Sequence, residues 1–160
     1  MTIFIIIIIV IGILYFFNSD RKDEKIQVLQ VGGMKRIYPN FLQLIDGLSK
    51  KKQSIVEWEA SNFECVKDDG EYLEFKFTYI EDEKIVGYYF IGIQHVFVSF
   101  AYCYCKNSKN QKIEGFMREL PKQSANNQSR DIDIEQYRWI FRGLINQMEN
   151  SEKYDKKFYT

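Results

Sequence analysis

The sequence predicts an α+β protein: an N-terminal transmembrane helix, one further helix, a four- or five-stranded antiparallel meander sheet, and a C-terminal helix packed on one sheet face. Three observations carry this prediction. Residues 1–19 form an uncharged apolar run, a period of two dominates residues 54–105, and helical apolar stripes flank that region. Because 160 residues suit one folded unit, we assign 1–19 to an anchor, 20–37 to a linker and 38–160 to a single α+β domain.

The anchor is predicted from length and composition. Residues 1–17 include five consecutive isoleucines and would rise roughly 25 Å as a helix, slightly short of the ~30 Å hydrocarbon core of a bilayer. Asn18 and Ser19 extend the uncharged run. The alternative is a cleaved signal peptide. No basic residue precedes the run, however, and Leu14–Phe17 offers no small-residue cleavage site. We therefore expect an uncleaved single span.

The side of the membrane follows from basic residues. Arg21, Lys22 and Lys25 come directly after the span, and no basic side chain precedes it. The positive-inside rule then places the following domain in the cytoplasm. Cys103 and Cys105 look like unpaired thiols, which agrees with a reducing compartment. We expect a single-pass membrane protein whose domain is cytoplasmic.

The first helix of the domain is predicted to begin at Pro39, a residue well suited to a helix start. The apolar residues that follow it are spaced i, i+3, i+4 and i+7, which indicates one buried stripe. These residues are Phe41, Leu44, Ile45 and Leu48.

The sheet is predicted from alternation of polar and apolar residues. A period of two begins at Ser54 and is clearest over residues 73–79. Turns are expected at Asp68–Gly70 and at 81–84. The apolar parity changes near Ser61–Asn62, which predicts a bulge there.

Later strands alternate less clearly. Residues 85–105 are apolar on both parities and are expected to break near Gln94–His95, and residues 113–120 would form the last strand. The strand order stays open, because the 85–105 region could pair in more than one register.

The C-terminal helix is expected to be capped by Asp131 or Asp133. Its apolar stripe holds over four turns and consists of Ile134, Tyr137, Phe141, Leu144, Ile145 and Met148. In the charged tail after it, Tyr154, Phe158 and Tyr159 are predicted to dock on the domain.

The composition argues against several classes of function. With 22 basic and 22 acidic side chains, the chain lacks the excess of positive charge that a nucleic-acid binder uses to neutralise phosphates. Three cysteines are too few for a disulfide scaffold. The sequence holds no phosphate-binding loop, dinucleotide fingerprint, zinc-protease motif or serine-hydrolase motif. We therefore expect no nucleic-acid partner, no cofactor and no enzymatic activity.

The cysteines and the single histidine are candidates for reactive or metal-binding groups. Cys103 and Cys105 point the same way on a strand, and Cys65 and His95 could complete four ligands. Zinc motifs pair their ligands more tightly, so we expect no metal site. His95 could act as a general base for a cysteine nucleophile, but a lone histidine at a strand junction is more often structural. An enzyme that uses His95 and carboxylates remains a third hypothesis.

One feature predicts a binding surface. Two helices cover one face of a sheet, yet the strands between 85 and 105 are apolar on both faces. The second face carries Tyr88, Tyr102 and Tyr104, whose amphipathic rings suit interfaces. We predict that these three tyrosines bind a protein partner. The alternative is a curved sheet that encloses a pocket for an apolar ligand or lipid near the membrane.

The general plan resembles the small immunity proteins of interbacterial competition. The shared features are an N-terminal span, a compact α+β domain without a catalytic motif, and a composition low in proline and rich in lysine, isoleucine and asparagine. The resemblance implies an immunity-type inhibitor that occludes a toxin or enzyme. It assigns no functional residues.

Overall fold

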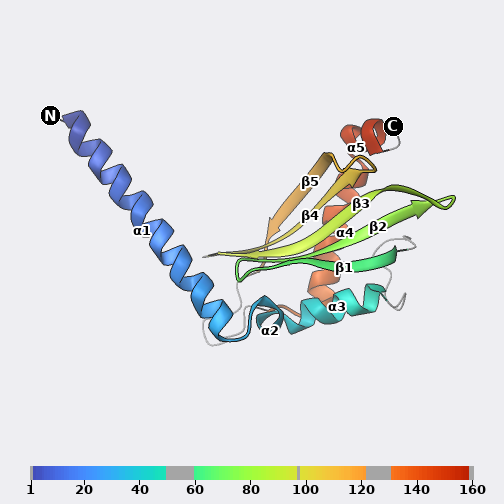
Figure 1. The fold of residues 1–160 in the computed structure, drawn as a ribbon, viewed down its shortest axis with the longest axis horizontal. Coiled ribbons are helices and arrows are strands. Elements are labelled where there is room, and N and C mark those ends of the chain that lie inside the picture. Colours follow the sequence, from blue (N-terminus) through green and yellow to red (C-terminus); the bar gives the residue numbers. More distant parts are fainter. Residues whose placement is uncertain (1, 50–59, 97, 122–130, 159–160) are drawn as a thin grey trace.

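The computed structural model describes residues 2–49, 60–96, 98–121 and 131–158 (Figure 1). Its elements in chain order are α1 (Thr2–Gln30), α2 (Met34–Ile37), α3 (Pro39–Ser49), β1 (Ala60–Asp68), β2 (Tyr72–Glu81), β3 (Lys84–His95), β4 (Ser99–Asn107), β5 (Lys112–Glu119), α4 (Ile134–Glu149) and α5 (Glu152–Phe158). The predicted α+β fold is confirmed, with the helices and the meander sheet in the expected order.

Helix α1 is one continuous element of 29 residues. It is long and apolar enough to span a membrane or to act as a signal sequence. Its apolar side chains are exposed from Ile3 to Leu14 and on to Phe17, and the helix projects away from the rest of the chain in Figure 1. The helix does not end at Ser19, so most of the predicted linker is helical.

Two glycines end α1. Gly32 and Gly33 both have positive φ angles, of 104° and 85°, which favour glycine. Their amides donate to the carbonyl oxygens of Leu29 and Val28 at 3.1 and 2.9 Å. These bonds satisfy carbonyls that the helix terminus would otherwise leave without a donor.

The sheet has five antiparallel strands in the order β1-β2-β3-β4-β5. The order that the sequence left open is therefore sequential. Asp82 and Glu83, with φ angles of 48° and 62°, make the tight turn between β2 and β3, as predicted. The register shift between Ala60 and Asn62 confirms the expected bulge. Residues 54–59, where the period of two begins, lie outside the described residues.

Helices α3 and α4 pack together, with α4 against β4 and β5 and α3 against β1. Phe41 of α3 stacks on Phe141 of α4 with ring centroids 5.5 Å apart. The sheet contributes alternate residues to this core: Leu73, Phe75, Phe77, Tyr89, Ile91, Ile93, Ala101, Cys103 and Cys105. The other parity of each strand therefore faces away from α3 and α4.

The two candidate caps of α4 have different roles. Asp133 is the N-cap and forms a capping box with Gln136. Asp131 is buried instead, and its carboxylate accepts from the hydroxyl of Tyr137 and the amide of Asn40, both at 2.7 Å. Asp131 thus ties the start of α3 to the start of α4.

The predicted docking of the tail is confirmed for two residues. Tyr154 and Phe158 of α5 are buried against Tyr89 of β3, with ring centroids 6.4 and 5.4 Å from it. Tyr159 lies outside the described residues. Helix α5 therefore extends the helical layer on the same sheet face.

Candidate functional site

The sheet face opposite α3 and α4 is the candidate site. We call it the open face and define it by Lys67, Tyr72, Glu74, Lys76, Tyr88, Phe90, Gln94, Tyr102, Tyr104, Lys106 and Lys112. Within the described ranges, no helix packs across it. All three predicted partner-binding residues, Tyr88, Tyr102 and Tyr104, lie on this face.

The register places glycines beside two of these tyrosines. Gly92 pairs with Tyr102 across β3 and β4, and Gly115 pairs with Tyr104 across β4 and β5. A Cβ on Gly92 would stand 2.5 Å from the Tyr102 ring, and a Cβ on Gly115 would stand 2.6 Å from Tyr104 Cβ. The glycines therefore let the tyrosine side chains lie close against the sheet.

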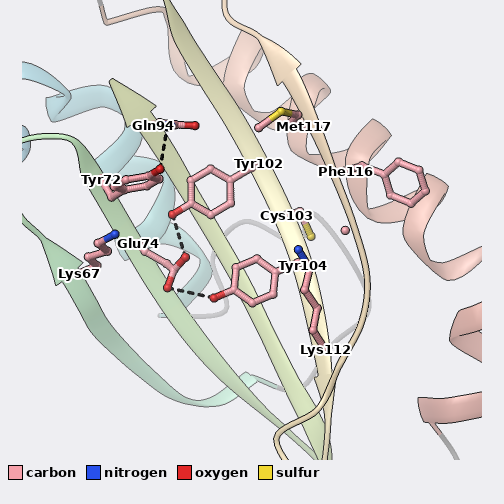
Figure 2. A pocket seen from close by; sticks show the side chains of 11 residues that line it. Lys67, Tyr72, Glu74, Gln94, Tyr102, Cys103, Tyr104, Lys112, Phe116 and Met117 are labelled. Carbon is pink, nitrogen blue, oxygen red and sulfur yellow. Dashed lines mark hydrogen bonds between the residues drawn. The ribbon is translucent and has the colours of Figure 1, made fainter. Parts of the chain in front are cut away.

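Glu74 of β2 lies at the centre of the face. Its carboxylate oxygens accept hydrogen bonds from the hydroxyls of Tyr102 at 2.8 Å and Tyr104 at 3.2 Å (Figure 2). Burial and the nearby Glu74 charge raise the pKa of both tyrosines above its usual range. Both hydroxyls thus stay protonated and donate over the whole physiological pH range.

The rings form a connected array. Phe90 stacks on Tyr104 with centroids 4.5 Å apart and planes 4° apart. Tyr104 is stacked with Tyr102 at 6.3 Å, and Tyr102 meets the edge of Tyr72 at 6.3 Å. Phe90 and Tyr102 are buried, with 6% and 9% of their surface exposed, whereas Tyr72 and Tyr104 are half-buried. Each ring is held by the next, and the half-buried rings are the part of the array that reaches the surface.

Each of four lysines on the open face covers an aromatic ring. The Lys67 ammonium lies 3.5 Å from the Tyr72 centroid, and three others lie 5.1 Å from theirs: Lys76 over Tyr88, Lys106 over Phe90 and Lys112 over Tyr104. These distances fit cation–π contacts. Each of these ammonium groups is thereby held against an aromatic ring of the open face.

A depression of about 560 Å³ lies on the open face. Tyr72, Glu74, Gln94, Tyr102, Tyr104 and Lys112 are among the residues that line it (Figure 2). Tyr88 stands outside it, beside Lys76. The sequence therefore predicted the tyrosines of the face but not Glu74, whose partners lie 28 and 30 residues away.

The cysteines considered as reactive groups have separate environments. Cys103 and Cys105 are buried on the helix-covered face, whereas Cys65 is exposed. Burial raises the pKa of Cys103 well above its usual range and that of Cys105 to about 11. Both groups are therefore thiols at neutral pH. Among the described residues, no three His, Cys, Asp or Glu side chains are grouped to hold a metal ion.

His95 belongs to a buried polar cluster. Its Nδ1 lies 2.5 Å from the Tyr38 hydroxyl, which lies 2.7 Å from Ser99 Oγ. Its Nε2 lies 3.4 Å from the Glu24 carboxylate of α1. With 4% of its surface exposed, His95 offers no access to a substrate and instead joins α1 to the sheet.

A second set of contacts attaches α1, and sequence reasoning missed it. Arg21 pairs with Glu71, and Lys25 Nζ lies 3.7 Å from Asp69. With Glu24 and the buried Val28, the attaching residues stand at i, i+3, i+4 and i+7. This spacing places them on one helix face, and it was the signal available in the sequence.

Comparisons of the chain with protein-family models, with curated proteins and with solved structures found no match.

Proposed function

We propose that this chain is a membrane-anchored, non-enzymatic protein-binding domain. Helix α1 would cross the membrane once through residues 1–19, with the domain on the cytoplasmic side. A protein partner would dock on the open face at Tyr88, Tyr102 and Tyr104. In its concrete form the chain is an immunity-type inhibitor that occludes a toxin or an enzyme.

One observation carries this proposal: the open face holds a connected aromatic array over which no described helix packs. Tyrosine-rich surfaces with polar hydroxyls are typical of protein interfaces and of their energetic centres. The array is already ordered through Glu74, so binding costs little further side-chain entropy.

The pocket alternative has less support. An enclosed site buries most of its ligand in apolar surroundings. The depression on the open face instead contains the Glu74 carboxylate, two tyrosine hydroxyls and the ammonium-bearing Lys67 and Lys112. Cys103, Phe116 and Met117 also line it, so the lining is mixed, and its charged and hydroxyl groups suit a protein surface better than a wholly apolar ligand.

The experiment is site-specific photo-crosslinking of the full chain in its native cell. A photoreactive phenylalanine analogue at position 88 on the open face should yield one crosslinked protein of defined mass. The control places it at Trp139, which is 69% exposed on α4. Crosslinks of equal pattern from both positions, or none from position 88, would contradict the proposal.

A charge variant adds a second check. Tyr88→Asp places a carboxylate at the half-buried position beside Lys76. It should abolish the crosslink from a probe at a neighbouring open-face position while the domain still unfolds cooperatively. An unchanged crosslink would remove Tyr88 from the docking surface.

A further inference from the structure

Two lysines of the open face stand directly opposite each other. Lys106 of β4 pairs with Lys112 of β5 in the sheet register, and Tyr88 of β3 pairs with Lys106 on the other side. Like charges directly opposite each other on neighbouring strands destabilise a sheet. Within the described part of the chain, no carboxylate forms an ion pair with either lysine. The fold therefore tolerates two neighbouring positive charges at this position.

Both ammonium groups are positioned by the same pair of rings. Lys106 Nζ lies 5.1 Å from the centroid of Phe90, and Lys112 Nζ lies 5.1 Å from that of Tyr104. These two rings are stacked with their centroids 4.5 Å apart, and Figure 2 shows Lys112 beside Tyr104. Because the ring contacts already restrict the lysine side chains, an anionic group that meets them costs less side-chain entropy.

The acidic residues of the open face are compensated or distant. Glu64 has an ion pair with a lysine of β2 at 3.5 Å, and Glu74 accepts hydrogen bonds from two tyrosine hydroxyls. Glu119 lies at the other end of β5, seven residues from Lys112, or about 23 Å at roughly 3.3 Å per residue. That separation exceeds the Debye length of about 8 Å at physiological ionic strength. The charge of Glu119 is therefore screened from the lysine pair.

The acidic residues that border this end of the face are also directed elsewhere. Glu114 lies two residues from Lys112 on β5, but its carboxylate pairs with Lys153 of α5, on the helix-covered side, at 3.3 Å. The acidic residues 82–83 form the tip of the turn between β2 and β3. This tip lies at least about 16 Å along the strand beyond Tyr88.

A third lysine adds to the positive charge. Lys109 is exposed in the turn between β4 and β5, three residues from both Lys106 and Lys112. We call these three residues the basic corner of the open face. Lys106 is half-buried and the other two are exposed, so a docked surface can reach all three. Since Tyr88 is the cross-strand neighbour of Lys106, the basic corner adjoins the predicted docking surface.

We propose that the protein partner presents an acidic segment to the basic corner, with aspartate or glutamate side chains that meet Lys106 and Lys112. The inference rests on the proposed docking at Tyr88 and adds to it the charge of the partner's surface. A carboxylate between the two ammonium groups relieves their repulsion. Complementary charge of this kind mainly speeds association and selects the partner.

The test is carbodiimide coupling of the full chain in membranes isolated from its native cell. A water-soluble carbodiimide joins a lysine side chain to a carboxylate in contact with it through an amide bond. Mass spectrometry should find Lys106 or Lys112 joined to an aspartate or glutamate of the same protein that the photoreactive probe at position 88 captures. Lys156 and Lys157, which are exposed on α5 on the other side of the sheet, should form no bond to that protein.

A set of matched variants separates this contact from net charge. Lys106→Gln with Lys112→Gln should weaken the photo-crosslink from position 88 at least about tenfold, because both attractive charges are lost. Lys106→Arg with Lys112→Arg keeps the charges and should retain the crosslink. Lys156→Gln with Lys157→Gln makes the same change in net charge on the other side of the sheet and should also retain it. Thermal unfolding checks that all three variants are folded.

Three results would overturn the inference. The first is an undiminished crosslink from position 88 in the variant with glutamine at both 106 and 112, which would leave the proposed docking in place without an acidic partner surface. The second is coupling of Lys106 and Lys112 to another copy of this chain alone, which would show that a second copy covers the corner. The third is coupling of the captured protein to Lys156 as often as to Lys106. If the unsubstituted chain gives no crosslink from position 88, the proposed function itself fails, and the inference fails with it.

Discussion

Tyr102 lies over Gly92 so closely that the glycine has no room for a side chain. A Cβ at position 92 would stand 2.5 Å from the tyrosine Cζ and hydroxyl and 2.7 Å from the Leu73 carbonyl oxygen. The ring thereby crosses β3, and its hydroxyl reaches Glu74 on β2. The centre of the open face thus depends on the smallest residue beneath it.

Gly92→Ala is expected to lower the free energy of unfolding by about 1–3 kcal/mol, the usual cost of overpacking. The added methyl group must displace the Tyr102 ring, since the Leu73 backbone closes the other side. Denaturant unfolding of the full chain in detergent measures this cost.

Gly143→Ala is the matched control. A Cβ at position 143 would meet only Arg118 Nη1, at 3.9 Å. Alanine in the middle of α4 should be neutral or stabilise the protein by about 0.5–1 kcal/mol. Equal destabilisation by the two alanines would contradict the role of Gly92.

The attachment of α1 should depend on pH through Glu71. Burial raises the pKa of Glu71, but the hydrogen bond and charge of Arg21 outweigh it and leave the pKa below its usual value. Because the pKa of Glu71 is lowered in the folded state, its ion pair with Arg21 stabilises the attachment of α1 at pH values above the unfolded-state pKa, about 4.3. This stabilisation is lost as the pH falls through the folded-state pKa. Amide protection factors of residues 21–30 should therefore fall below about pH 4.

Arg21→Gln removes the partner that lowers this pKa. The variant should show weak protection of residues 21–30 already at neutral pH. Lys22→Gln makes the same change in charge at the next, exposed residue and should behave like the unsubstituted chain. If both variants keep full protection at pH 7, the ion pair does not hold α1.

Phe158 holds α5 on the sheet. Its ring occupies the space over Gly87, where a Cβ would stand 2.5 Å from Phe158 Cε2, and it stacks on Tyr154 at 4.7 Å. Phe158→Ala should cost about 3 kcal/mol, at the low end for a buried aromatic residue.

Trp139→Ala removes a larger ring from an exposed position, where Arg118 lies over it at 5.0 Å. It should cost less than about 1 kcal/mol. Thermal unfolding of the two variants compares them, and the reverse order of stability would show that α5 is not docked.

Tyr137→Phe should destabilise the junction of α3 and α4 at neutral pH. Burial raises the pKa of Asp131, and the hydrogen bond from Tyr137 partly offsets that rise. Without the hydroxyl, the ionised carboxylate loses one donor, at a cost of about 1.5–3 kcal/mol. The cost should shrink in acid, where Asp131 is protonated. The same cost at pH 7 and pH 3 would show that the carboxylate charge plays no part.

Local patterns predicted the sheet and its two faces. Asp82 and Glu83 occupy the predicted tight turn, and the parity of Tyr88, Tyr102 and Tyr104 put them on one face. Turn chemistry and strand alternation depend on residues adjacent in the chain, so they can be read without the fold.

The contacts of α1 could not be read in this way. In the sequence, residues 20–30 look like a charged linker. Glu24 of α1 pairs with His95, which lies 71 positions later at the end of β3. The same holds for Glu74, whose bonds with Tyr102 and Tyr104 need both the sheet register and the glycines beside it. The spacing of Arg21, Glu24, Lys25 and Val28 marks one helix face in the sequence, but it does not name the residues on other elements that pair with that face.

If α1 spans the membrane as proposed, its unbroken course from the apolar run to Arg21 fixes the rotation of the domain about the helix axis. A helix turns about 100° per residue. One residue inserted after Ser19 would therefore swing the whole sheet by that angle about the α1 axis, while it moved the sheet away from the bilayer by only about 1.5 Å. If one residue of α1 contacts a neighbouring helix in the bilayer, the number of residues between that position and Arg21 fixes the direction in which the strands point around the α1 axis.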